Sequence, residues 1–180
     1  MHAPLNDRQP PLTPHAVYHW FHALGYWSVV ALWMACISAL STDPFSAQNT
    51  HRYIDPVLRW LFPGLTPSGF VTAHTVIRKT AHFLEFFVLG ALIFWATRRG
   101  RPPRWRWTWS MHALALSGTW ALLDELHQAF VVSRTASLWD SAIDALGAAA
   151  SQCVIYFRSR FAGRKAAARP DSLLDSNSGL

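Results

Sequence analysis

Long apolar runs dominate the pattern along this chain, and four of them have the length and spacing of membrane-spanning helices. About 20 apolar residues are needed to cross a hydrocarbon layer roughly 30 Å thick. The run at 20–40 reaches this length without a charged residue. Further spans are predicted at 78–97, 107–128 and 138–157, each with charged residues at one end. The pattern therefore predicts an all-α fold, a four-helix transmembrane bundle.

Polar segments flank this predicted membrane domain, which occupies residues 20–157. Residues 1–19 are predicted to be a cytoplasmic N-terminal tail, and the apolar run after them is interpreted as a retained span rather than a cleaved signal. Residues 158–180 begin with basic side chains and continue with small polar ones, which is typical of a disordered cytoplasmic tail.

The connection between the first two spans, residues 41–75, holds a second apolar pattern. Apolar residues recur at helical spacing over 54–62, and a Pro-Gly pair follows. Tyr53 and Trp60 are residue types that favour a membrane interface. The pattern predicts a short helix lying on the outer surface, and an irregular loop is the open alternative.

Lys and Arg residues in the flanks decide the predicted orientation, because positive residues are retained in the cytoplasm. Five arginines lie within 98–106, and a second basic group lies within 158–169. Both groups lie on the same side of the membrane only if the chain crosses outward in the third span and returns in the fourth. Both termini are therefore predicted to be cytoplasmic (N-in, C-in). The tryptophans within 95–109 are expected to form an aromatic belt at the inner boundary.

Composition changes this picture only in part. Hydrophobic residues make up 51% and charged residues 14% of the chain, which favours the membrane class over a soluble domain. The net charge of +6 would suit a nucleic-acid binder, but the positive charge lies in two groups beside apolar runs. Topology explains that charge better, and no nucleic-acid partner is predicted.

Ionisable residues gather at the predicted outer ends of the second, third and fourth spans. Because neighbouring spans run in opposite directions, residues far apart in the sequence are expected to meet in one layer. We call this layer the polar cluster, and its members are Lys79, His82, Glu85, Asp124, Glu125, Gln128, Arg134, Asp140 and Asp144. Ionisable residues in a membrane are costly, and they tend to be paired, interior and functional.

Helical spacing predicts which faces turn inward. Lys79 and His82 share one face of the second span, and Asp124 and Gln128 share one face of the third. The fourth span carries a stripe of polar and small residues, made of Asp140, Asp144, Gly147 and Ser151. Small residues allow helices to approach closely in lipid, so this stripe is expected to face the other helices.

Three interpretations of the polar cluster stay open. It could be a ligand site, or a salt-bridged plug, in which the cations only neutralise the carboxylates. It could also be a metal site of His82, His127 and nearby acids. The metal interpretation is the weakest, because no HExxH pattern occurs and His82-x-x-Glu85 is short. No Gly-rich phosphate loop or nucleophile elbow occurs either. We therefore predict no metal and no cofactor, and His74, His112 and the N-terminal histidines are interpreted as incidental.

Two stretches within these spans, Ile77–Phe87 and Asp124–Val131, resemble the VanZ-like family of small multi-pass bacterial membrane proteins. Arg134 and the acidic stripe follow in the order expected, and the similarity covers residues 76–150. The chain departs from the family where Phe86 replaces a frequent Tyr. It departs again where Val132-Ser133 replaces a common Pro-Gly before Arg134.

The resemblance implies a location in the bacterial cytoplasmic (inner) membrane and a cell-envelope role, since the family is associated with glycopeptide (teicoplanin) resistance. We predict an outward-facing polar pocket that engages a lipid head group or a lipid-linked cell-wall precursor. Such a site would contribute to envelope integrity or antibiotic tolerance. Lys79 and Arg134 would hold a phosphate or carboxylate, while His82 and the acids orient it or transfer protons.

Membrane lipids and an amphiphilic ligand are thus the expected partners. Two alternatives from other classes are a small proton- or ion-coupled transporter and a non-catalytic assembly or scaffold protein. The sequence pattern does not distinguish a binding site from a catalytic one, and it does not indicate the oligomeric state.

Overall fold

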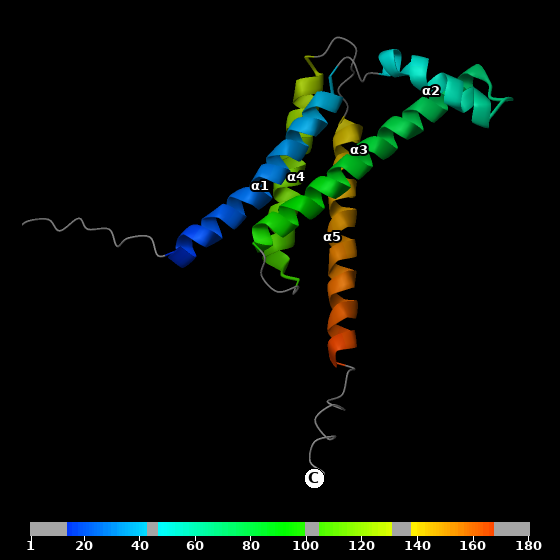
Figure 1. Cartoon of the computed structure of the whole chain (residues 1–180). Coiled ribbons are helices and arrows are strands. Elements are labelled where there is room, and N and C mark those ends of the chain that lie inside the picture. Colours follow the sequence, from blue (N-terminus) through cyan, green and yellow to red (C-terminus); the bar gives the residue numbers. More distant parts are fainter. Residues whose placement is uncertain (1–13, 43–46, 100–104, 131–137, 168–180) are drawn as a thin grey trace, which may run out of the picture.

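The computed structural model describes residues 14–42, 47–99, 105–130 and 138–167, and these form helices and short connections without a strand. The helices are α1 (Pro14–Leu40), α2 (Ala47–Leu61), α3 (Pro67–Arg98), α4 (Trp107–Gln128) and α5 (Leu138–Ala167) (Figure 1). The fold is all-α, as the apolar pattern predicts.

Helix α3 begins before the predicted second span at 78–97, and the bounds of that span in a membrane stay a prediction. The helix begins at Pro67 because Thr66 caps it: the Gly69 amide donates to Thr66 Oγ1 over 3.2 Å. Proline in the first turn needs no hydrogen-bond partner, so it suits this position. The outer connection is therefore shorter than predicted. By contrast, the bounds of α4 coincide with the predicted span at 107–128.

Parts of both predicted tails are helical, because α1 begins at Pro14, within residues 1–19, and α5 continues to Ala167, within residues 158–180. Part of the C-terminal extension has its own local support. Arg160 Nε donates to Tyr156 Oη over 3.1 Å, and its guanidinium lies over the Tyr156 ring. Such contacts one helical turn apart favour continued helix. The remainder of each tail, residues 1–13 and 168–180, lies outside the described residues.

Helix α3 is the centre of the arrangement, because it packs against each of the other four helices. Its C-terminal half supplies fully buried apolar side chains, Phe86, Leu89 and Ile93, and Phe94 meets the edge of Trp109 with ring centroids 5.9 Å apart. The apolar core therefore lies around the C-terminal half of α3. The start of α1, the end of α3, the start of α4 and the end of α5 all lie toward that side (Figure 1).

The closest approach is between α3 and α5. A Cβ atom added at Gly147 would collide with the backbone of Phe83, and one added at Gly90 would come within 3.1 Å of the Cα atom of Ala148. Asp144 and Ser151, the neighbours of Gly147 in the stripe, are buried. The prediction that this stripe faces the other helices is confirmed.

The connection between α1 and α3 contains a helix, α2, and not the irregular loop that was its alternative. Helix α2 buries Leu58, while Tyr53, Val57 and Trp60 are exposed. It lies beside the first turns of α3, away from the crossing of α3 and α5 (Figure 1). Its location at a membrane surface stays a prediction.

By length and composition, α3 is the one helix within the described segments that meets the requirements of a membrane span. Helix α1 has a shorter apolar part, Leu24–Leu40. The four-helix transmembrane arrangement and its orientation therefore stay predictions, and they are taken up below.

Candidate functional site

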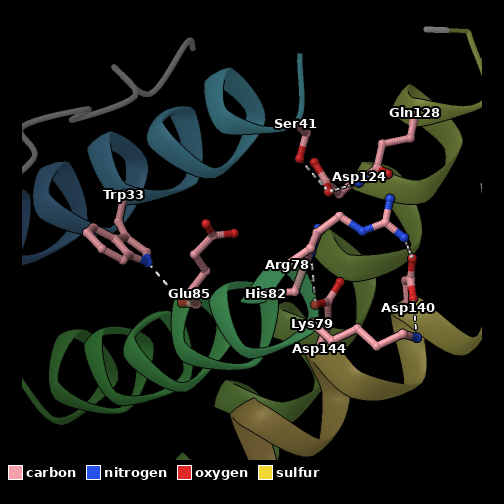
Figure 2. Close-up of polar contacts among 10 residues, drawn as sticks. All are labelled: Trp33, Ser41, Arg78, Lys79, His82, Glu85, Asp124, Gln128, Asp140 and Asp144. Carbon is pink, nitrogen blue, oxygen red and sulfur yellow. Dashed lines mark hydrogen bonds and ion pairs between the residues drawn. The ribbon is translucent and has the colours of Figure 1, made fainter. Parts of the chain in front are cut away.

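The polar cluster begins, on the side nearer α2, with two cations that share one carboxylate (Figure 2). Arg78 Nη2 lies 3.3 Å from one oxygen of Asp140, and Lys79 Nζ lies 3.0 Å from the other. The Asp140 side chain is buried, whereas the two cations are about one-third exposed. Arg78 was not among the predicted members. Its position next to Lys79, in a stretch rich in ionisable residues, is the signal that would have identified it.

One turn further along α3 and α5, His82 faces Asp144. His82 Nδ1 lies 3.3 Å from Asp144 Oδ1, which is an ion-pair distance, but the alignment does not meet hydrogen-bond geometry. Asp144 is fully buried, and within the described segments neither of its oxygens receives a hydrogen bond. A buried carboxylate without donors is costly. This position therefore has acceptor capacity that a ligand or water would fill.

Asp124 of α4 is held from two helices through a single oxygen. Its Oδ2 accepts hydrogen bonds from Ser41 Oγ and from Gln128 Nε2, each over 2.8 Å (Figure 2). Its other oxygen, Oδ1, is buried and receives no donor within the described segments. Gln128 was predicted to share a helix face with Asp124. Ser41 was missed, because it follows an apolar run and carries no charge.

Helix α1 contributes a second contact that the sequence reasoning missed. Trp33 Nε1 donates to the backbone oxygen of Glu85 over 2.9 Å and so attaches α1 to α3 (Figure 2). The Glu85 side chain is half-buried, and Glu125 of α4 is buried. The predicted meeting of the second, third and fourth spans thus occurs, and α1 closes one side of it.

One residue considered in the sequence does not join this arrangement, and another lies outside the described residues. His127 is exposed, so the proposed metal set of His82, His127 and acids is not assembled. Arg134, the predicted holder of a phosphate or carboxylate, lies outside the described residues. The cations that can be placed are therefore Arg78 and Lys79.

A small cavity opens beside the cluster. It has a volume of about 180 Å³, and its polar lining comes from the end of α1, from α2 and from α3, with Ser41, Thr50, His74, Arg78, His82 and Glu85. This is below the roughly 300–1,000 Å³ of sites that enclose a whole drug-sized ligand. A phosphate or amine fits such a space, whereas a complete sugar-lipid does not.

A larger groove of about 1110 Å³ lies at the other end of the bundle, between α4 and α5. Its walls are mostly apolar and aromatic, with Trp105, Tyr156 and Phe157 among them. Of these two cavities, the small one has several ionisable groups in its lining, so we place the candidate functional site there.

The two placed cations of the cluster share one carboxylate. Arg78 and Lys79 both engage Asp140, and neither forms an ion pair with Asp124 or Asp144 within the described segments. Oδ1 of Asp124 and both carboxylate oxygens of Asp144 are buried and receive no hydrogen bond within the described segments. These oxygens favour a site that accepts hydrogen bonds, protons or cationic groups.

Comparison with known proteins gave one finding. A sequence model described as VanZ/LLP1 matches residues 26–159, a segment that contains all described members of the polar cluster. No curated protein and no solved structure matches the chain.

Proposed function

The chain belongs to the VanZ/LLP1 family, and we propose that it is a multi-pass inner-membrane protein whose polar cluster engages a lipid head group. The proposed ligand combines a phosphate with hydroxyl or amine groups, as lipid-linked cell-wall precursors and amine-bearing phospholipids do. Through this ligand the protein would contribute to envelope integrity or antibiotic tolerance. Both termini would lie in the cytoplasm and the cluster near the outer surface.

The distribution of side chains supports the membrane location. Large apolar residues such as Leu32, Leu122 and Leu146 are exposed on α1, α4 and α5. Beside the apolar core, the buried positions between the helices also hold serines, glutamines and carboxylates. A soluble bundle would expose fewer large apolar side chains, because water favours their burial. Lipid accepts such an exterior, and small or polar residues then mediate helix packing.

The observation that carries the ligand proposal is the adjacency of two complementary chemistries. Arg78 and Lys79 are one-third exposed at the rim and can hold a phosphate by charge-assisted hydrogen bonds. Deeper in the cluster, oxygens of Asp124 and Asp144 are buried and receive no donor within the described segments. Hydroxyl or ammonium groups would supply those donors. A head group that carries a phosphate and also a hydroxyl or ammonium group would contact the cations at the rim and the buried carboxylates.

Native mass spectrometry of the full chain, purified in mild detergent and titrated with defined phospholipids, tests this proposal. We expect Asp124→Asn to weaken binding of an anionic, amine- or hydroxyl-bearing lipid, because the amide lacks the negative charge and replaces one acceptor oxygen with a donor. Arg160→Gln is the control, since it removes a charge at the far end of α5. Equal lipid retention by wild type, the Asp124 variant and the control would refute the head-group proposal.

Proton coupling is the second candidate function, and the contact between His82 and the fully buried Asp144 favours it. Ionisable pairs of this kind serve as proton relays in membrane pumps. Reconstitution in proteoliposomes with an internal pH dye distinguishes the candidates. A transporter would dissipate an imposed pH gradient and lose this activity in His82→Gln, whereas a head-group site would leave the gradient intact.

A further inference from the structure

Three side chains of metal-binding types meet where α2 folds back on α3, outside the polar cluster. His51 and Asp55 lie on one face of α2, one turn apart, and His74 comes from α3. Asp55 Oδ1 lies 2.6 Å from His74 Nε2 and 3.3 Å from His51 Nδ1. The two imidazole rings have centroids 4.0 Å apart. One carboxylate oxygen thus faces two imidazole nitrogens.

The fold brings these residues together through a tight helical hairpin. Helix α2 ends at Leu61, the Leu65 amide donates to the Phe62 oxygen over 3.1 Å, and α3 begins directly afterwards. Asp55 and His74 lie at nearly equal distances along the chain from this turn. Residues so placed in antiparallel helices come to the same level, so they face each other.

We propose that His51, Asp55 and His74 form a binding site for a divalent zinc ion. Their ligand atoms all lie within 4.8 Å of one another. In a tetrahedral zinc site with bonds of about 2.0–2.1 Å, ligand atoms are separated by about 3.3 Å, so small side-chain movements suffice. Imidazole nitrogen with carboxylate oxygen is a donor set that suits zinc.

The access to these three side chains is appropriate for metal binding. The His74 side chain is 6% exposed and His51 is 44% exposed. One ligand is therefore held in the interior, while the opposite side is open to solvent. A purely structural bridge between α2 and α3 would need only one histidine.

A site with three protein ligands leaves a coordination position for water or another oxygen ligand. His74 also lines the small cavity beside the polar cluster, together with Arg78 and Glu85. A zinc ion at this hairpin would therefore adjoin the proposed head-group site without sharing a ligand residue with the polar cluster.

Zinc uptake and cobalt spectroscopy on the full chain, purified in detergent without a histidine tag, test the proposal. We expect equilibrium dialysis to give about one zinc ion per chain that Asp55→Asn and His74→Gln both lose, because each removes a ligand. His112→Gln is the matched control, since His112 is an exposed histidine on α4. Zinc uptake unchanged in the Asp55 and His74 variants, or lost equally in the control, would overturn the proposal.

A rescue variant keeps the test valid if these substitutions impair folding. Asp55→Cys replaces one ligand type with another, so its cobalt complex should show thiolate-to-metal charge-transfer absorption that wild type lacks. Wild type contains Cys36 and Cys153 elsewhere and serves as the reference for this band. Cobalt bound by the Cys variant without that absorption would show that position 55 is not a ligand position.

Discussion

Gly147 of α5 lies directly against the backbone carbonyl of Phe83 in α3, with no space for a side chain between them. This contact sets the separation of the two helices at the level just below His82 and Asp144. The polar cluster therefore depends on a backbone-to-backbone approach that only glycine permits. The first prediction follows from this relationship.

Gly147→Ala should destabilise the protein by about 1–3 kcal/mol, the usual cost of overpacking, because the Phe83 backbone cannot move aside. Gly118→Ala is the control, since a Cβ atom there meets nothing within 4 Å. Helix propensity should make the control neutral or stabilising by up to about 1 kcal/mol. Thermal denaturation in detergent measures both variants. Equal melting temperatures for the two variants would contradict the close approach.

Asp140→Asn separates a functional site from a salt-bridged plug. The substitution leaves Arg78 and Lys79 without their shared carboxylate, but both cations are about one-third exposed and can be hydrated. We therefore expect a modest loss of stability, about 1 kcal/mol, with full loss of the envelope phenotype. Growth under cell-wall antibiotic stress, in a host lacking its own family member, is compared with protein abundance. If the variant loses the phenotype only to the extent that it loses folded protein, the charges act as a salt-bridged plug and not as a functional site.

Ser41→Ala tests the attachment of α1 to the cluster. The hydroxyl is one of two donors to Asp124 Oδ2, and its removal should cost about 0.5–1.5 kcal/mol, as for an ordinary hydrogen bond. Ser28→Ala, which removes an exposed hydroxyl of α1, should cost less. Melting temperatures of the two variants provide the comparison. A larger effect at Ser28 would place the α1 anchor elsewhere.

Cysteine labelling tests the orientation, which is predicted from the basic flanks. Gly64→Cys and Gly163→Cys lie at opposite ends of the bundle, and neither added Cβ atom meets a neighbour. In a background without Cys36 and Cys153, an impermeant maleimide should label position 64 on intact cells. Position 163 should react only after permeabilisation. The reverse pattern would place the polar cluster on the cytoplasmic side.

Much of the helical architecture was predictable, because apolar length and helical periodicity are local properties of a sequence. The bounds of α4 and the inward stripe of α5 follow from such patterns. Helix ends were less predictable. The Thr66 cap lies where α3 begins before the predicted span, and contacts around Tyr156 lie where α5 continues beyond it. A hydropathy pattern does not reveal such local hydrogen bonds, so it did not predict these helix ends.

The sequence by itself determined that acidic and basic residues of α3, α4 and α5 would share one level, because helix direction and length dictate depth. Tertiary packing alone decided the pairing: Asp140 with Arg78 and Lys79, and Asp124 with Ser41. Packing also brought His51, Asp55 and His74 together, and of these the sequence analysis considered only His74, which it interpreted as incidental. Depth depends on distance along one helix, whereas pairing depends on the rotation of each helix about its axis. That rotation is set by contacts between helices, such as the one between Gly147 and Phe83.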